Sequence, residues 1–380
     1  MNFELSDEQR ALQEAARGAL SRHKTVEAAR DALDGGERLD LWDTAREVGW
    51  PGLLVSEERG GAGLGGLDAM LVMAECGRVL ASVPLLGHVP ATAVLDAAGV
   101  GDDVLGPLAE GERRAAFVGA QPPGDLTSEW TVDARRGHAR APAPRSEVDG
   151  DVAVVTGEAA WVPDAPGAEV LVVATVDSDG APRAVLLEAG ADGVTVEPVV
   201  RYDATRLLGH VKLEGARGTV LAAADTELAA AWYLAQGLLA AESLGAVERA
   251  LESSVEYAKE RFTFGRAIGS YQAVKHALVE VLRRMENARS LMYYAGWARQ
   301  DAPAEFPLAA SAARVAASRA EDFASRELIS VHGGIGATWE HDAPYYFRRA
   351  QLSRRLLGGA GSATDRVAGE LLAQAGAAPA

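Results

Sequence analysis

Hydrophobic positions along the chain change their spacing twice, first from helical to strand-like and then back. The first third opens with a helix signal, in which Ser6 precedes Gln9 by three residues and Asp7 and Glu8 place negative charge at the helix start. Helical patterning recurs at 39–50 and 66–81, and Cys76 in the second of these segments fits a buried helix position. We therefore expect an N-terminal helical domain over residues 1–111.

The middle third has the pattern of short strands. Five valine-rich runs alternate with turn dipeptides such as Asp149-Gly150 and Asp179-Gly180; the runs are DVAVVTG, EVLVVATV, RAVLLEA, GVTVEPV and HVKLEG. This spacing predicts a small antiparallel β domain over 112–224. Residues 121–147 are rich in proline and lack such runs, so we expect a long irregular loop there.

From Asp225 onward the pattern is helical again. One helix is expected over roughly 226–260, and another begins at Pro307 and is rich in alanine. Between them, apolar residues recur at alternating steps of four and three, as in a helix packed lengthwise against its neighbours: Val274, Leu278, Val281, Met285, Ala288, Met292 and Ala295. The sequence thus predicts an α+β fold, mainly α, that ends in a helical bundle over 225–380.

Composition and charge narrow the class of protein. The 380 residues are 48% hydrophobic and 24% charged, as in ordinary globular proteins, and the formal net charge is −17. Such a negative field argues against nucleic acid or an anionic membrane as the main partner. We expect a cytoplasmic protein, because no apolar run approaches the roughly 18 residues of a spanning helix and the first residues lack a signal-peptide pattern. The single cysteine excludes an internal disulfide and a multi-cysteine metal site, and we expect no metal.

Against this acidic background, residues 261–276, RFTFGRAIGSYQAVKH, gather basic and aromatic side chains. The segment resembles the signature Arg-x-x-Phe-Gly-Arg-x-Ile-x-x-Phe-Gln-x-x-Lys-His of the acyl-CoA dehydrogenases, and VHGGIGATWEHD at 331–342 resembles their second signature. The segment EVGWPGLLVSEERGGAGLG near the start and AVERALESSVEYAKERF before the first motif extend the likeness over nearly the whole chain.

The resemblance implies an FAD-dependent enzyme that acts on an acyl-CoA. In this family the basic turn reaches the FAD of a neighbouring subunit, so Arg261 would pair with the pyrophosphate, Thr263 would hydrogen-bond nearby and Phe264 would pack on the cofactor. Tyr271 and Gln272 would lie further along the same FAD. Gly333 and Gly334, lacking a Cβ, would let the backbone approach it closely. The family expectation for the electron acceptor is an electron-transferring flavoprotein, which the sequence does not specify.

The same resemblance exposes a missing catalytic base. The implied reaction removes two hydrogens from an acyl thioester, and a carboxylate takes the proton next to the carbonyl. The position that carries this glutamate in most of the family is Gly358 here, and the alternative position on the preceding helix is Ala235. Glu242 lies seven residues beyond Ala235, about 10 Å away on the same helical face. We keep Glu242 both as a candidate base and as a member of a structural polar network.

Features that would hold a flavin on this chain itself are also altered. The family's flavin-binding loop in the β domain is hardly matched by FVGAQPPGDLTSEW, and Trp161 is followed by Pro163 where a hydroxyl residue is expected. Proline offers neither a hydroxyl nor an N–H group. The chain therefore keeps residues that reach a neighbour's FAD and loses those of its own site, as expected of one subunit of an α2β2 heterotetramer.

Three functions remain open at this stage. The first is a dehydrogenase subunit that works with a related, base-carrying chain. The second is a self-sufficient homotetramer, with Glu242 or another group as base or with a different flavin reaction. The third is a flavin-free assembly or acyl-CoA binding protein on the same scaffold, because fold alone does not fix function.

Overall fold

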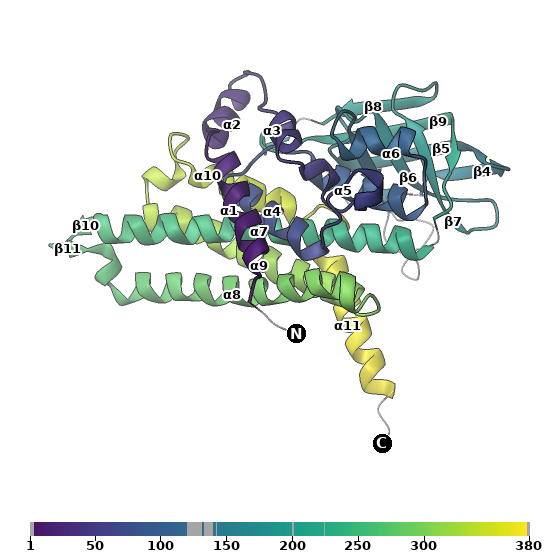
Figure 1. Cartoon of the computed structure of the whole chain (residues 1–380). Coiled ribbons are helices and arrows are strands. Elements are labelled where there is room, and N and C mark those ends of the chain that lie inside the picture. The colour runs from purple at the N-terminus through teal and green to yellow at the C-terminus, as the bar shows by residue number, and fades with distance from the viewer. Residues whose placement is uncertain are drawn as a thin grey trace.

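The computed structural model describes residues 4–119, 131–132, 140–141, 143–199, 201–223 and 225–377. Helices predominate, and a strand region separates two helical parts (Figure 1). Most of the loop expected at 121–147 lies outside the described residues, as does most of FVGAQPPGDLTSEW. The helices of the first part are α1 (Asp7–Leu20), α2 (Thr25–Leu33), α3 (Trp42–Glu47), α4 (Gly66–Arg78), α5 (Leu85–Ala97) and α6 (Asp102–Ala109).

The first helix begins as its sequence predicts. The side chain of Ser6 accepts a hydrogen bond from the backbone N–H of Gln9, and the side chain of Gln9 accepts one from the backbone N–H of Ser6. This reciprocal capping satisfies two of the N–H groups that a helix start leaves without partners. The helix then packs against α4 through Ala16, Ala19 and Leu20.

The strands of the middle part lie between residues 115 and 220, and most of them form one main sheet. They are β1 (Ala115–Val118), β4 (Arg145–Asp149), β5 (Val152–Pro163), β6 (Val170–Val176), β7 (Pro182–Glu188), β8 (Val194–Pro198) and β9 (Leu208–Val220), beside a separate pair formed by β2 (Thr131–Val132) and β3 (Arg140–Ala141). Each of the five valine-rich runs falls within a strand or overlaps one. Because β7 pairs with both β6 and β9, the pairings close on themselves.

Most strand pairs are antiparallel, as the turn dipeptides suggest. The exceptions involve β6, which pairs in parallel with β1 along four residues and with β4 at Arg145 and Val176. This parallel edge was not predicted, because β1 and β6 are far apart in the chain and no short turn connects them. The short hairpin turns do follow the sequence, and Gly150 and Gly180 both adopt positive φ.

The C-terminal part is built on two very long helices, α7 (Asp225–Glu260) and α8 (Gln272–Asp301). They run side by side and meet at a projecting end, where β10 (Phe262–Thr263) and β11 (Arg266–Ala267) form a small hairpin (Figure 1). The remaining helices are α9 (Phe306–His332), α10 (Ala343–Ser353) and α11 (Gly359–Ala377). The predicted seam of α8 faces α7 and α9, with Val281, Met285 and Ala288 buried.

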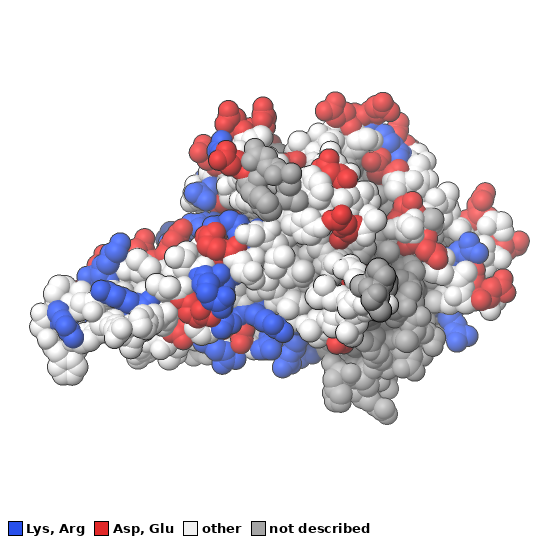
Figure 2. All heavy atoms as spheres, turned by 90° about the horizontal axis from the view of Figure 1, so that it is seen from below, with Lys and Arg blue, Asp and Glu red and all other residues white. Residues whose placement is uncertain are grey.

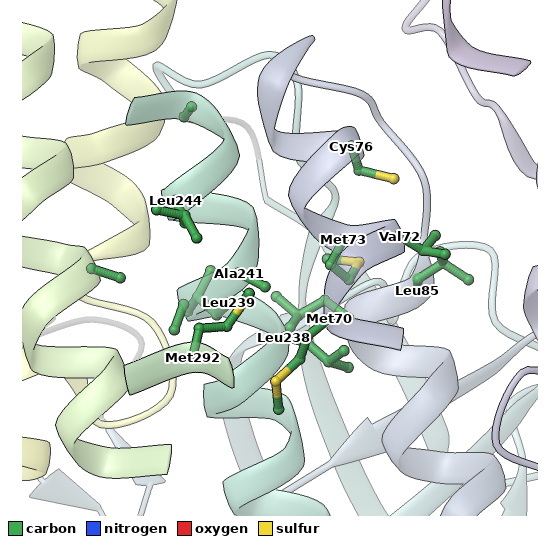
Figure 3. Packing of buried hydrophobic residues seen from close by; sticks show 14 of the residues in the cluster. Met70, Val72, Met73, Cys76, Leu85, Leu238, Leu239, Ala241, Leu244 and Met292 are labelled. Carbon is green, nitrogen blue, oxygen red and sulfur yellow. The ribbon is translucent and has the colours of Figure 1, made fainter. Parts of the chain in front are cut away.

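A glycine contact locks the two helical parts together. A Cβ atom on Gly77 of α4 would lie 1.9 Å from the carbonyl oxygen of Glu242, and one on Gly245 of α7 would lie 1.8 Å from that of Ala74. Only glycine allows the two backbones to approach so closely. Around this crossing, Met70, Met73, Cys76, Leu238 and Ala241 pack in one continuous core (Figure 3). The position of Glu242 is therefore fixed by the contact between α4 and α7.

Candidate functional site

The basic and aromatic segment forms the projecting end of the α7–α8 pair. Arg261 follows the last residue of α7, and its backbone both donates to the carbonyl of Tyr257 and accepts from the N–H of Ile268. The side chain of Arg261 is exposed and forms no ion pair or hydrogen bond with any described residue. Because it has no partner among the described residues, this guanidinium is available to bind an anionic group.

Aromatic residues at this end are presented to solvent on a rigid turn. The side chain of Phe264 is 94% exposed, and its backbone φ of 50° is unusual for a residue with a Cβ. Tyr271 holds the turn through two contacts. Its hydroxyl donates to the carbonyl of Thr263 at 3.1 Å, and the guanidinium of Arg266 lies over its ring, 4.0 Å from the ring centre. Gln272 is the first residue of α8. Exposed aromatic residues on such a firm support are typical of a surface that binds something.

The glycine segment lies beside this projecting end. The ring of His332, the last residue of α9, stacks on Tyr257 of α7 with ring centroids 4.3 Å apart. A Cβ on Gly333 or Gly334 would meet nothing within 4 Å, whereas one on Gly336 would meet the carbonyl of Ile329 at 2.7 Å. Gly336 is thus needed for internal packing, while Gly333 and Gly334 leave open space next to the tip. An exposed guanidinium at Arg261 and an open stretch of backbone at Gly333 and Gly334 therefore occur at the same end of the molecule.

Trp161 occupies a strained position in β5. Its φ is 60°, and it sits at an irregularity where the pairing of β5 with β9 shifts register. The backbone N–H of Trp161 donates to Nδ1 of His210 at 3.3 Å, and the guanidinium of Arg201 lies 3.9 Å from the centre of the Trp161 ring. Pro163, two residues on, is buried and offers no hydrogen to a ligand. The surroundings of Trp161 therefore do not fit a flavin ring that needs a donor at this point.

The two positions expected for the base lie next to each other in space. Gln236, which follows Ala235 on α7, donates from Nε2 to the carbonyl of Leu357 at 3.2 Å, and Leu357 precedes Gly358. Gly358 has a φ of 78°, and a Cβ atom added to it would lie 3.3 Å from the indole of Trp232. One location in the molecule thus contains both positions, and neither residue carries a carboxylate.

Glu242 is buried in a network of charged side chains. Its two carboxylate oxygens accept hydrogen bonds from the guanidinium groups of Arg206 and Arg349. Glu242 as a whole is only 4% exposed. Arg349 also pairs with Asp203 at 3.0 Å. The carboxylate of Glu242 is thus engaged on both oxygens by buried arginines. This arrangement fits the structural role better than that of a base.

Two further buried carboxyl groups, those of Asp164 and Glu321, were not predicted as site residues from the sequence. Burial raises the pKa of Asp164 to about 7, although the backbone N–H of Gly87 donates to Oδ2 at 2.8 Å and opposes the shift. Burial likewise raises the pKa of Glu321 to about 7, against the effect of the hydroxyl of Ser243, which donates to Oε2 at 2.7 Å. Their local sequences gave no signal, because burial arises from segments distant along the chain.

Within the described residues there is neither a candidate metal site nor a candidate membrane span. Among the described residues, no three histidine, cysteine or acidic side chains gather as ligands of an ion. Likewise, no helix in the described part of the chain is long and apolar enough to cross a bilayer.

Comparisons with known proteins match both helical parts of the chain. Family models match residues 6–101 as an acyl-CoA dehydrogenase N-terminal domain and residues 228–372 as an acyl-CoA dehydrogenase C-terminal domain. The acyl-CoA dehydrogenase IpdE2 of Mycobacterium tuberculosis is 34% identical over 355 residues, which cover 92% of this chain and 93% of that protein. IpdE2 of Mycolicibacterium smegmatis is 31% identical over 357 residues, covering 93% of this chain and 96% of its own.

Solved structures show the same fold. A variant of the Tcur3481–Tcur3483 steroid ACAD superposes with a TM-score of 0.85 at 28% identity, over 98% of this chain and 99% of that one. The ChsE4–ChsE5 complex from Mycobacterium tuberculosis gives a TM-score of 0.85 at 25% identity, and the match covers 100% of both chains.

Proposed function

Because the chain belongs to the acyl-CoA dehydrogenase family, we propose that it is one subunit of an FAD-dependent dehydrogenase in which a related chain carries the catalytic base. The main support for this proposal is that Ala235 and Gly358 occupy one location in the structure, where the family resemblance calls for a carboxylate and neither residue has one. The substrate would be an acyl-CoA thioester, which would lose a proton from its α carbon to the base and a hydride from its β carbon to the flavin.

The residues of the projecting end would serve a flavin bound mainly by the partner. Arg261 would bind its pyrophosphate, and Thr263 and Phe264 would contact it from the same turn. Gly333 and Gly334 would leave room for its close approach, while Tyr271 and Gln272 would hold the start of α8 beside it. FAD, when bound, supplies the acceptor for the hydride that the substrate loses.

Related proteins support an assembly of two different chains. The ChsE4–ChsE5 structure is a complex, and the Tcur3481–Tcur3483 protein likewise carries two names. In this chain the altered residues, Gly358, Ala235 and Pro163, would belong to its own site, whereas Arg261 and the glycine segment face outward. Both groups of residues are accounted for if this chain contacts the flavin of its partner and the partner carries the base.

A self-sufficient enzyme is the second candidate, and Asp164 and Glu321 favour it. A base works best when its pKa lies near the working pH, and both groups have a pKa of about 7. Both, however, are buried and already hydrogen-bonded within the chain. We therefore rank this candidate below the heteromer.

Purification of the chain alone and together with a related chain distinguishes these candidates. We expect the isolated chain to show little dehydrogenase activity, and the pair to form a complex of about four chains with fewer than one FAD per chain. Absorbance of the flavin, light scattering and acyl-CoA oxidation provide the readouts. A yellow homotetramer with full flavin content and activity would overturn the proposal, and a complex without flavin would favour a binding or assembly protein.

A further inference from the structure

The loop 333–342 between α9 and α10 is closed at its base by two histidine rings. His332 is the last residue of α9, and His341 lies two residues before the start of α10. Their ring centroids are 4.3 Å apart, and the ring of His332 also stacks on that of Tyr257 in α7. We call these three rings the histidine clamp. It fixes the base of the loop against α7, where the backbone N–H of Arg261 donates to the carbonyl of Tyr257.

The far side of the loop is held by Arg30 of α2. Its guanidinium donates to the carbonyl oxygens of Trp339 and Glu340, at 2.8 and 3.3 Å, and pairs with Asp342 at 3.1 Å. The loop is therefore attached both to the first helical part and, through the clamp, to the C-terminal one. The glycines with open space around them, 333 and 334, follow the clamp directly, so the clamp sets their place.

Hydrogen bonds fix which nitrogen of each clamp histidine carries a hydrogen. Nδ1 of His332 lies 2.8 Å from the carbonyl oxygen of Leu328, which can only accept, so this Nδ1 donates. Nδ1 of His341 accepts from the backbone N–H of Ala343 at 3.1 Å and therefore carries no hydrogen in the neutral ring. A second proton on His341 can enter only at Nδ1, and it would end that hydrogen bond.

The hydrogen bond to His341 caps the start of α10. Pro344 has no N–H group, and the N–H of Tyr345 donates to the carbonyl of Asp342. The N–H of Ala343, a residue with 0% exposure, has the ring of His341 as its partner. Protonation of His341 would leave this buried donor unpaired and would place a positive charge at the positive end of the helix dipole. The closed loop therefore requires a neutral ring at this position.

The groups around His341 also oppose a positive charge on it. Burial lowers the pKa of His341 from its ordinary value, repulsion from His332 and Arg30 adds to this, and Asp342 acts in the opposite direction. Asp342 is itself paired with Arg30, and the group that faces the clamp from α7 is the neutral Tyr257. Figure 2 shows further basic side chains along the underside of the long helices. Such surroundings suit an anionic cofactor and favour the neutral imidazole.

We propose that His341 is a positioning residue for the partner's flavin: its neutral ring keeps the loop closed and holds Gly333 and Gly334 beside that cofactor. This role rests on the flavin contact proposed above. Because a proton on His341 ends the cap of α10, acid opens the base of the loop and loosens the contact. The ring does not touch the flavin itself; it acts through the backbone that it holds.

The direction of the pH effect follows from the two states of the loop. In the open loop His341 titrates at the ordinary histidine pKa of about 6.5, whereas the closed loop holds its pKa lower. Below about pH 6.5 the open loop therefore binds more protons, and the free energy of opening falls as the pH drops toward the lowered pKa. Near pH 7.5 the ring is neutral in both states, so opening no longer depends on its protonation.

Hydrogen–deuterium exchange of the isolated full chain tests the clamp without flavin. After correction for intrinsic exchange, protection of residues 333–343 should fall several-fold from pH 7.5 to pH 5.0, within a limit of about thirtyfold set by the ordinary histidine pKa. His341→Asn should stay protected at pH 5.0, because its Oδ1 accepts from the N–H of Ala343 and does not titrate. His341→Phe keeps a ring but offers no acceptor, so its protection should be low at both pH values. His23→Asn, at a histidine that bonds Thr44, is the matched control and should behave as the parent.

Flavin retention in the co-purified complex tests the positioning role. After dialysis at pH 5.0 the parent complex should hold at least about threefold less FAD than after dialysis at pH 7.5, since the loop then opens more readily. The complex with His341→Asn should hold similar amounts at both pH values, whereas His23→Asn should lose FAD as the parent does. The ratio of flavin to protein absorbance is the readout.

The outcomes separate this inference from the proposed function. Equal protection of the parent loop at the two pH values would show that His341 does not control the loop. Equal loss of FAD from the parent and from His341→Asn at pH 5.0 would remove its positioning role, while flavin bound at pH 7.5 would leave the proposed function intact. A complex without flavin at either pH would overturn the proposed function and the positioning role together, and the exchange data would still decide whether the clamp opens with acid. Thermal unfolding of each variant shows whether the chain remains folded.

Discussion

At the scale of single residues, Asp164 shows how burial changes an ordinary side chain. Its carboxyl group lies inside the protein, where the charged form is disfavoured, and its pKa rises to about 7. The folded state therefore holds a proton that the unfolded chain releases near pH 4. Because the folded state binds more protons between pH 4 and pH 7, this group lowers stability as the pH rises through that window, and the loss persists above it.

We predict that Asp164→Asn stabilises the protein at pH 8. The amide oxygen can still accept from the N–H of Gly87, and the cost of a buried negative charge disappears. The gain should be on the order of 4 kcal/mol at pH 8 and should vanish toward pH 4, where the native carboxyl group is also neutral. Urea unfolding of both proteins across this pH range provides the measurement. An equal difference at all pH values would mean that Asp164 is not the titrating group.

At the scale of elements, the α7–α8 hairpin separates binding residues from the body of the protein. The two long helices pack through a buried seam, and their common end presents Arg261 and Phe264 outward. The seam and the helix ends are local patterns, which is why the sequence predicted them closely. The approach of His332 to Tyr257, which brings the glycine segment beside this end, depends on the packing of α9 against α7.

We predict that Arg261→Ala weakens FAD retention in the assembled complex. Loss of a charge-assisted contact to phosphate, worth about 1.5 to 3 kcal/mol, corresponds to roughly ten- to a hundredfold weaker binding. The ratio of flavin to protein absorbance after dialysis measures the effect. Lys259→Ala removes an exposed basic side chain two residues before Arg261, and this control should retain the parent flavin content. Equal flavin in the Arg261→Ala complex would remove Arg261 from the proposed contact.

At the scale of the whole molecule, Glu242 connects three regions of the chain. It lies on α7, and its partners come from the segment before β9 and from α10, at Arg206 and Arg349. Breaking one member of a buried ion network leaves other charges without partners, which costs more than the pair itself contributes. The network therefore ties the segment before β9 to two helices of the C-terminal part, α7 and α10.

We predict that Glu242→Gln destabilises the protein by about 3 to 5 kcal/mol. In the assembled enzyme, turnover should fall less than tenfold at temperatures where the variant is folded, because loss of a true base costs a hundredfold or more. Chemical unfolding and acyl-CoA oxidation are the two measurements. Glu197→Gln, which removes an exposed ion pair with Lys212, should change stability little. A collapse of turnover with unchanged stability would make Glu242 the base.

The sequence by itself determined the features that depend on neighbours along the chain. These include the capped start at Ser6, the seam of α8, the strand runs and the absence of a carboxylate at Ala235 and Gly358. Helical and strand periodicities arise from local backbone geometry, so a single sequence is sufficient to read them.

Only the tertiary structure decided which distant residues meet. Gln236 and Leu357 are 121 positions apart, and Glu242 and Arg349 are 107 apart, yet each pair is in direct contact. The first contact shows that the two expected base positions form one location, and the second explains why Glu242 is held by charge. The parallel pairing of β1 with β6 likewise could not be predicted from the sequence. Such contacts follow from how whole elements pack, which no local periodicity encodes.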